Sequence, residues 1–188
     1  MIFLALILSS LLASIPFGVI FALYFSDKDP RKHGSFNIGM TNAWRVCGWE
    51  VGVLTLMGDL GKSALLIAIF QSHLTEHTLS LLTFSTVFFH CYSIYLNFDG
   101  GKGLATASGV LLVIEPFWFF MLFISWLVIR LITQSSSIAA FSAIGLMLFL
   151  CCSILSENQM GFFAITTLIA WRHRENVDRL MTHSELAP

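Results

Sequence analysis

Charged residues are scarce in this sequence. Only 11% of its 188 residues are charged, whereas soluble domains carry about 25%. Hydrophobic residues make up 56% of the chain, and the mean hydropathy is +0.81. This composition argues against a soluble globular domain and predicts a chain that lies in a lipid bilayer.

Patterns for disulfides, metals and signal cleavage are also lacking. The four cysteines show no metal-ligand spacing, and two adjacent ones lie in an apolar run, where thiols act as small hydrophobic side chains. The six histidines include no HExxH motif. Residues 1–25 carry no basic n-region, so we expect a retained first span rather than a signal peptide. We expect no metal site and no cofactor.

Long apolar runs occur repeatedly, and a membrane span needs roughly 20 such residues. Clear candidate spans are residues 2–25, 49–70, 78–96 and 138–155. A fifth run, 104–129, is interrupted by Glu115 and Pro116, which either kink one helix or turn the chain between two helices. The last run, 160–171, is short. No soluble segment remains, so we expect one transmembrane domain over residues 1–188.

Basic residues predict the topology, because Lys and Arg collect on the cytoplasmic side of a membrane protein. The connections at 71–77, at Glu115 and at 156–159 contain neither residue. If Glu115 and Pro116 form a turn, the chain has seven spans and nine basic residues share one face. If they form a kink, there are six spans and the basic tail lies opposite the basic loops. We therefore predict an all-α integral membrane protein of about seven helices, with the N-terminus outside and the C-terminus cytoplasmic.

The segment HGSFNIGMTNAWR, residues 33–45, follows the first span and is rich in hydrogen-bond donors. Glycines let backbone N–H groups approach an anion, and Arg45 offers a planar guanidinium that binds phosphate through two hydrogen bonds. An ordinary polar connection has a similar composition, so both interpretations stay open. The candidate ligands are Gly34, Ser35, Asn37, Gly39, Thr41, Asn42 and Arg45.

A second polar stretch, NFDGGKGLAT at residues 97–106, lies between two apolar runs. Its glycines are suited to an anion-binding nest of N–H groups at a helix start, with the Lys102 ammonium as the positive charge. It lacks the GxxxxGK[ST] pattern, so nucleotide hydrolysis is not indicated. A flexible turn uses the same residues. The candidate ligands are Gly100, Gly101, Lys102, Gly103 and Thr106.

Two further features carry chemistry. HRENVDRL, residues 173–180, follows the last span, and its arginines fit a positive-inside anchor or anionic lipid head groups. That anchor does not explain His173 and Asn176, whose i, i+3 spacing puts both on one helix face. The literal H-x4-D match in this stretch lacks the α/β domain that carries such a motif, so we interpret it as coincidence. Within the second span, Asp59 and Lys62 form either a structural ion pair or the floor of a substrate pocket.

Taken in order, these segments resemble one family, the bacterial membrane glycerol-3-phosphate acyltransferases that use acyl phosphate, known as PlsY. GSFNIGMTNAWR is similar to the family motif GSGNIGATNxxR. FHCYSIYLNFDGGKGLAT is similar to GHxxPxxLxFxGGKGVAT, and HRENVDRL to HRxNIxRL. The Asp-x-x-Lys pair at Asp59 and Lys62 is similar as well. The resemblance covers nearly the whole chain.

The resemblance implies transfer of an acyl group from acyl phosphate to the 1-hydroxyl of glycerol 3-phosphate, giving lysophosphatidic acid and phosphate, the first step of bacterial phospholipid synthesis. The donor is already activated, so neither a nucleophilic cysteine nor a metal is required. The implied partners are the two substrates and membrane lipid, without nucleic acid, coenzyme A or acyl carrier protein. The implied location is the bacterial inner membrane, with the active site facing the cytoplasm.

The resemblance also implies roles for residues, because two anionic substrates need surrounding cations and N–H donors. Catalytic roles fall to Ser35, Arg45, Lys102, His173 and Asn176. Substrate-binding roles fall to Gly34, Asn37, Gly39, Thr41, Asn42, His90, Gly100, Gly101, Gly103, Thr106 and Arg174. The proton acceptor stays open between His173, His90 and a substrate phosphate oxygen.

The chain departs from the family motifs at Phe36, Met40, Phe89, Ser93 and Asp99. Phe36 stands between the expected ligands Ser35 and Asn37, where we expect it to narrow the pocket or to displace a backbone donor. Two other functions are kept as alternatives. One is a non-catalytic paralogue that binds lipid phosphate. The other is a small anion transporter, which would show internal repeats that this sequence does not display.

Overall fold

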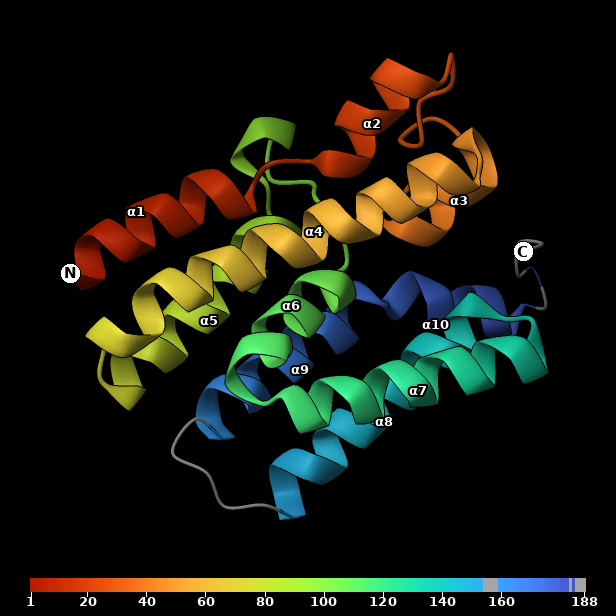
Figure 1. Ribbon diagram of the computed structural model, residues 1–188. Coiled ribbons are helices and arrows are strands. Elements are labelled where there is room, and N and C mark those ends of the chain that lie inside the picture. Colours follow the sequence, from red (N-terminus) through yellow and green to blue (C-terminus); the bar gives the residue numbers. More distant parts are fainter. Residues whose placement is uncertain (154–158, 183, 185–188) are drawn as a thin grey trace.

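The computed structural model describes residues 1–153, 159–182 and 184, and within these ranges it is helical and contains no strand (Figure 1). The helices of the first half are α1 (Ile2–Ala13), α2 (Phe17–Phe25), α3 (Met40–Cys47), α4 (Trp49–Phe70), η1 (Gln71–His73) and α5 (Glu76–Cys91). Those of the second half are η2 (Ile94–Leu96), α6 (Leu104–Ile114), α7 (Pro116–Thr133), α8 (Ser136–Ser153), α9 (Gln159–Arg172) and α10 (Arg174–Met181).

Several helical segments have the length and apolarity of membrane spans. Among the described residues four qualify: Ile2–Phe25, Trp49–His73, Glu76–Leu96 and Pro116–Thr133. Leu104–Ile114 and Ser136–Cys152 are shorter apolar helices. The predicted all-helical membrane fold is confirmed. The last two residues of the predicted span 138–155, and residues 156–158 of the following connection, lie outside the described residues.

The first span is broken in its middle. Ser14, Ile15 and Pro16 separate α1 from α2. Proline lacks an N–H group and its ring clashes with the preceding helical turn, which ends α1 here. The Ile15 carbonyl oxygen accepts a hydrogen bond from the Lys62 ammonium group of α4, 2.8 Å away. The span predicted at residues 2–25 is therefore present as two short helices.

The chain turns at Glu115 and Pro116 rather than kinking. Glu115 has φ −135° and ψ 69°, outside the helical region, and Pro116 is the first residue of α7. α6 and α7 pack against each other, and Figure 1 shows the chain reversing direction between them. This geometry favours the seven-span interpretation of the sequence.

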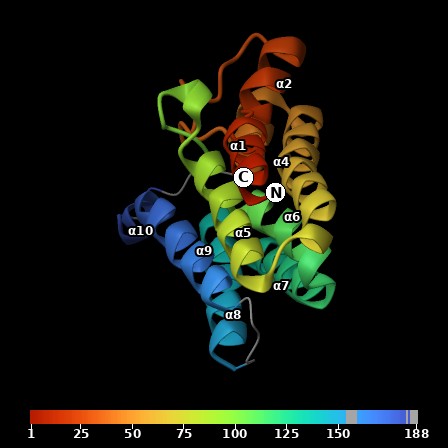
Figure 2. The ribbon, with the colours of Figure 1, turned by 90° about the vertical axis from the view of Figure 1, so that its left-hand side faces the viewer.

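α4 is the central helix, packed against α1, α2, α3 and α6. Gly109 allows α6 to approach α4 closely, because a Cβ at this position would lie 2.2 Å from the Leu60 carbonyl oxygen. The hydroxyl of Ser63 in α4 donates to the Thr106 carbonyl oxygen of α6 at 2.8 Å. Figure 2 shows α1, α4 and α5 grouped together, with α9 beside α5 and with α7 and α8 below them. This packing leaves α7 mostly exposed, because only 11% of its residues are buried.

Connections rich in basic residues lie at one end of the molecule. Figure 1 places the N-terminus, η1 and the α6–α7 turn at one end, and the α2–α3 connection, the α7–α8 connection and α10 at the other. The first group lacks Lys and Arg, and the second contains five of the ten in the chain, namely Lys28, Arg31, Lys32, Arg174 and Arg179. This separation is the one that the seven-span topology requires. Which end faces the cytoplasm stays a prediction.

Candidate active site

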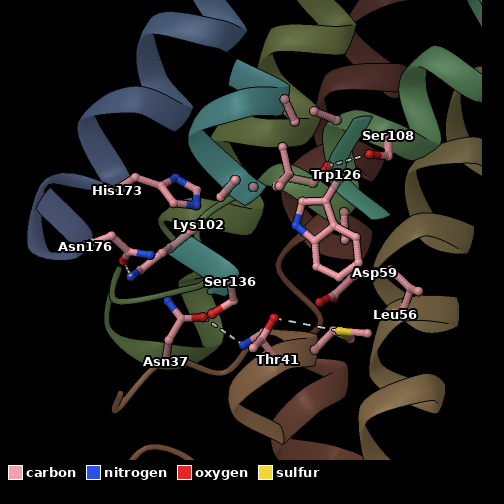
Figure 3. Close-up of a pocket in the computed structure, with 18 of the residues that line it drawn as sticks. Asn37, Thr41, Leu56, Asp59, Lys102, Ser108, Trp126, Ser136, His173 and Asn176 are labelled. Carbon is pink, nitrogen blue, oxygen red and sulfur yellow. Dashed lines mark hydrogen bonds between the residues drawn. The ribbon is translucent and has the colours of Figure 1, made fainter. Parts of the chain in front are cut away.

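A pocket of about 190 Å³ lies between the basic end of the molecule and its interior. Its polar lining comes from Ser35, Asn37, Thr41, Arg45, Lys102, Ser136, Ser137, His173, Asn176 and Arg179. Its apolar lining includes Leu56, Leu111, Leu122, Trp126, Ala143 and Met147. Figure 3 shows His173, Asn176, Lys102 and Asn37 on one side of the pocket, and Trp126 and Leu56 on the other. The pocket therefore joins a polar, cationic region to an apolar slot.

Asn42 holds the first polar segment in shape. Its buried amide nitrogen lies 2.9 Å, 3.0 Å and 2.9 Å from the carbonyl oxygens of Pro30, His33 and Asn37. Its Oδ1 atom accepts a hydrogen bond from the Ser35 N–H at 2.8 Å. The observed contacts of Asn42 organise the loop that carries Ser35 and Asn37 to the pocket. A direct contact between Asn42 and substrate stays a prediction.

Arg45 reaches the pocket from a helix rather than from a loop. The N–H of Gly39 donates to Asn37 Oδ1 at 2.8 Å, and α3 begins at the next residue. Arg45 follows in the last turn of α3, half-buried, with Nη1 3.5 Å from Asn42 Oδ1. Because helices are stiffer than loops, this placement fixes the direction from which the guanidinium enters the pocket.

Phe36 lies outside the pocket that the described residues form. Its side chain is 68% exposed, while its neighbours Ser35 and Asn37 line the pocket. Its φ is +59°, in the left-handed region that glycine adopts readily, and the family motif has glycine here. The expected narrowing of the pocket by Phe36 is therefore not observed. The departure instead leaves a strained backbone with an exposed ring.

The glycine loop is fastened to the end of α5. The N–H groups of Gly100 and Gly101 donate to the carbonyl oxygens of Cys91 and His90, at 3.0 Å and 3.1 Å. A Cβ on Gly101 would lie 2.2 Å from His90 Nε2, so this position admits no side chain. Of the predicted loop residues, Lys102 and Gly103 line the pocket, and α6 begins at the next residue. The two preceding glycines anchor the loop, and their roles as phosphate donors stay predictions.

Asn176 gathers two cations at the pocket wall. Its Oδ1 atom accepts hydrogen bonds from the Lys102 ammonium group and from Arg179 Nη2, the latter at 2.6 Å. Its amide nitrogen donates to Ser137 Oγ at 3.0 Å. Burial, reinforced by the nearby Arg179 charge, lowers the pKa of Lys102 to about 8. This concentration of positive charge is suited to an anionic ligand.

His173 presents a nitrogen lone pair to the same pocket. Its side chain is buried, and its Nδ1 lies 2.8 Å from the Ile169 carbonyl oxygen. A carbonyl oxygen only accepts, so Nδ1 carries the proton and Nε2 holds the lone pair. Burial lowers the pKa of His173 to about 4, which keeps the ring neutral near pH 7. As the i, i+3 spacing predicts, His173 and Asn176 line one site.

Asp59 and Lys62 form the ion pair that their spacing suggests. Lys62 Nζ lies 2.9 Å from Asp59 Oδ1, and the two side chains are 4% and 3% exposed. Asp59 and His90 of α5 line the pocket, and Lys62 contacts both of them. The pair thus lies beside the pocket, and a role of the pair toward substrate stays a prediction.

Other predicted residues lie further away. Thr106 is buried against α4, and its Oγ1 has no hydrogen-bond partner among the described residues. Arg174 is exposed, with its guanidinium 5.0 Å from the centre of the Trp171 ring. Gly34 adopts φ +65°, and a Cβ there would lie 2.2 Å from Asn42 Oδ1. Substrate contacts for these three residues stay predictions.

Sequence reasoning missed several lining residues. Ser136 and Ser137 begin α8, where the Ser135 hydroxyl accepts the Ile138 N–H at 3.0 Å. The run of three serines before an apolar stretch is a helix-start signal that would have placed them at a helix end. Arg179, interpreted from the sequence as part of a positive-inside anchor or as a ligand of lipid head groups, lines the pocket and contacts Asn176. Trp126 and Met147 lie in apolar runs, and nothing in their local sequence indicates that they line a pocket.

The fold and the site define a class of protein: an integral membrane protein whose cationic pocket continues into an apolar slot, as an enzyme of anionic lipids requires. Within that class, the chain belongs to the glycerol-3-phosphate acyltransferase family, whose model matches residues 3–183. It is thus a membrane acyltransferase that acylates glycerol 3-phosphate.

Individual relatives agree over nearly the full length. A glycerol-3-phosphate acyltransferase of Pseudomonas paraeruginosa is 36% identical over 190 residues, covering 98% of each chain. One of Latilactobacillus sakei is 38% identical, covering 95% of this chain and 88% of its own. The crystal structure of PlsY in its glycerol 3-phosphate form has a TM-score of 0.89 at 32% identity, covering 100% of this chain and 95% of that one. The lysophosphatidic acid form has a TM-score of 0.87 at 33% identity, covering 99% and 94%.

Proposed function

We propose that this chain, as a single transmembrane domain, transfers an acyl group from acyl phosphate to the 1-hydroxyl of glycerol 3-phosphate. The products are lysophosphatidic acid and inorganic phosphate. The hydroxyl oxygen forms a bond to the acyl carbonyl carbon, and the bond from that carbon to the phosphate oxygen breaks. Phosphate leaves with the electron pair. The glycerol-3-phosphate acyltransferase relatives, and the PlsY structures in a glycerol 3-phosphate form and a lysophosphatidic acid form, support this choice of acceptor and product.

One observation carries the proposal. Arg45, Lys102 and Arg179 line the polar side of a pocket that continues into an apolar slot. Two phosphate groups repel each other unless cations lie around them, and these three cations come from α3, the glycine loop and α10. The slot beside them suits a fatty acyl chain. Acyl phosphate combines both parts in one molecule, which favours it as the donor.

The attacking hydroxyl must lose a proton, and His173 Nε2 is suitably prepared to accept it. Its lone pair is free because Nδ1 donates to the Ile169 carbonyl oxygen. A phosphate oxygen of the substrate can accept the proton instead, and then His173 positions the hydroxyl group. Ser35, Asn37 and Thr41 add hydrogen-bonding groups at the pocket wall. Holding both substrates in line supplies several kcal/mol of the acceleration by itself.

We place the enzyme in the bacterial inner membrane with the pocket open to the cytoplasm. The basic end of the molecule carries the pocket, and basic residues collect on the cytoplasmic side. Glycerol 3-phosphate is water-soluble, whereas an acyl phosphate partitions into lipid. A pocket between the basic end of the molecule and its interior can take glycerol 3-phosphate from the water and acyl phosphate from the membrane. No coenzyme A or acyl carrier protein takes part in the proposed reaction.

The donor is tested by competition between three acyl sources. Purified protein in lipid mesophase receives labelled glycerol 3-phosphate with palmitoyl phosphate, palmitoyl coenzyme A or palmitoyl acyl carrier protein. We expect labelled lysophosphatidic acid, acylated at the 1-position, from palmitoyl phosphate alone. Equal or faster transfer from either thioester would overturn the assignment of the donor. Acylation at the 2-position would overturn the assignment of the acceptor hydroxyl.

A further inference from the structure

The three donors of the Lys62 ammonium group are fully used. Nζ lies 2.8 Å from the Ile15 carbonyl oxygen, 2.9 Å from Asp59 Oδ1 and 2.9 Å from His90 Nδ1. An ammonium group has three N–H bonds and accepts none, so each one meets an acceptor. The side chain is 4% exposed. Lys62 thus joins the break between α1 and α2, its own helix α4 and the end of α5.

This geometry fixes the tautomer of His90. Because Lys62 only donates, His90 Nδ1 must offer its lone pair. A proton on Nδ1 would point at the ammonium group, and the carboxylate of Asp59, at 3.7 Å from Nδ1, is too far away to accept it. The proton of the neutral ring therefore lies on Nε2.

The Nε2–H group lies at the glycine loop. The ring of His90 lies against Gly101, with Nε2 as the atom that a Cβ would meet first. His90 also lines the pocket. The backbone at the same place binds the loop, since the Gly101 N–H donates to the His90 carbonyl oxygen at 3.1 Å. His90 thus supports the loop that carries Lys102 and faces the pocket beside it.

His90 and His173 are therefore held in opposite tautomers. A carbonyl acceptor puts the proton of His173 on Nδ1 and leaves Nε2 as an acceptor. An ammonium donor puts the proton of His90 on Nε2 and makes that atom a donor. One histidine is prepared to receive a hydrogen bond from substrate, and the other to give one.

We propose that His90 donates a fixed Nε2–H hydrogen bond to a phosphate group bound beside the glycine loop, and that Lys62 is the positioning residue that sets this tautomer. His90 is then not the proton acceptor of the reaction. The Asp59 carboxylate, 2.9 Å from Lys62 Nζ, accepts another of the three N–H groups of the ammonium. The identity of the phosphate as substrate rests on the proposed function, whereas the tautomer does not.

The tautomer is read directly by nitrogen NMR of protein labelled with 15N-histidine. His90→Gln identifies the His90 signals by their disappearance. We expect a protonated Nε2 and an unprotonated Nδ1, and a shift of the Nε2 signal when glycerol 3-phosphate or inorganic phosphate is added. A proton on Nδ1 would overturn the role of Lys62. An Nε2 signal indifferent to both ligands at saturation would overturn the role of His90.

Kinetics separate a donor from a base. The side-chain amide of Gln retains an N–H donor near the position of Nε2, while Leu retains none and neither is basic. We expect His90→Gln to keep kcat/KM within about tenfold of wild type, and His90→Leu to lose about a hundredfold, mainly through KM. Equal and severe losses of kcat in both variants would make His90 the base. Wild-type kinetics in both would remove it from the site.

Lys62→Met tests the positioning role against a matched control. Lys32→Met removes the same charge from an exposed loop position and should leave kcat/KM unchanged. We expect Lys62→Met to release the constraint on His90, so that its spectrum shows both tautomers and KM rises. A single Nε2–H tautomer in Lys62→Met would contradict the proposal. If wild-type protein transfers no acyl group, the proposed function fails, while the tautomer and the phosphate-dependent shift still decide this inference.

Discussion

At the scale of single residues, the pocket is defined by how its cations are held. Lys102 and Arg179 meet at one oxygen of Asn176, and Asn176 is fixed in turn by Ser137. A side-chain amide is neutral, so it orients the two cations without neutralising them. The cations keep their attraction for an incoming phosphate. Arg45 completes the set from α3.

Arg45→Ala and Lys102→Ala should each lower kcat/KM for acyl transfer by at least about a hundredfold, because each removes a charged donor from the site. The melting temperature in detergent should change little, since both side chains lie at the pocket rather than in the core. Lys32→Ala, on an exposed loop, serves as the control and should retain wild-type rates. Near-normal rates in both pocket variants would remove the phosphate site from these residues.

The lowered pKa of Lys102 predicts that kcat/KM depends on pH. Burial, with Arg179 nearby, lowers its pKa to about 8, so the ammonium form is lost as the pH rises above that value. A neutral amine attracts phosphate far less, and kcat/KM reports the free enzyme. We expect kcat/KM for glycerol 3-phosphate to fall about tenfold between pH 8 and pH 9.5. Lys102→Arg stays charged over this range, so its residual activity should show no such fall. A flat wild-type profile would contradict the assignment.

Phe36 offers a test of whether a departure from the family motif affects catalysis. Its φ of +59° costs about 1 kcal/mol for a residue with a Cβ, and its ring is 68% exposed. Phe36→Gly should therefore leave kcat near wild type, with a melting temperature equal to or slightly above it. Phe36→Ala retains the Cβ without the ring, and its melting temperature should lie below that of Phe36→Gly. Loss of turnover in both variants would show that the aromatic ring itself serves the reaction.

At the scale of elements, α8 spans the length of the pocket. Ser136 at its start lies in the polar region, and Met147 lies eleven residues further on, about 16 Å along the helix axis. Both residues line the pocket, so α8 runs from its polar region into the apolar slot. Met147 is 3% exposed, which places it at a closed part of the slot.

Met147→Trp should shorten the acyl chain that the enzyme accepts. The larger ring fills space in the slot, so kcat/KM for palmitoyl phosphate should fall at least about tenfold relative to octanoyl phosphate. Phe149 lies on the same helix, and its side chain is 64% exposed. Phe149→Trp should therefore leave the ratio of kcat/KM for the two donors unchanged. The ratio of the two donors is measured by phosphate release. An unchanged ratio in Met147→Trp would show that the acyl chain lies elsewhere.

Local signals predicted some elements well and others only in part. The Glu115–Pro116 turn was one of two open interpretations, and packing between α6 and α7 decides it. The Asp59–Lys62 pair followed from spacing on one helix. The third partner, His90, lies 28 residues away on α5, and no periodicity links the two helices. The break at Pro16 was missed because the span was predicted from its overall apolar composition, which a single proline hardly changes.

The same limit applies to the site. His173 and Asn176 were found because they are close in sequence and on one helix. Ser137 meets Asn176 across 39 residues, and that contact depends on how α8 and α10 pack. Residue types indicated the glycine loop and Arg45 as candidates, and the resemblance to family motifs favoured them over ordinary loops, whereas the apolar slot residues lie outside those motifs. Tertiary packing decides such contacts, and local sequence does not encode them.

At the scale of the whole molecule, the separation of charge predicts the orientation in the membrane. Lys32 in the α2–α3 connection and Ser72 in η1 are both exposed, and Figure 1 shows these two segments at opposite ends of the structure. We replace Cys47 and Cys152, the two cysteines that are not buried, with serine, and introduce Lys32→Cys or Ser72→Cys. An impermeant maleimide should label Ser72→Cys in intact bacterial spheroplasts, and Lys32→Cys only after lysis. The reverse pattern would place the pocket on the outer face and contradict the proposed location.

The central claim is that this pocket carries out acyl transfer rather than ligand binding alone. Its most direct test is to give purified wild-type protein palmitoyl phosphate, with and without glycerol 3-phosphate, and to measure phosphate and lysophosphatidic acid together. We predict phosphate release that depends on glycerol 3-phosphate, with the two products in equal amounts and both absent from Lys102→Ala. Binding of either substrate without release of phosphate would contradict the account and identify a lipid-phosphate-binding protein that does not catalyse the reaction.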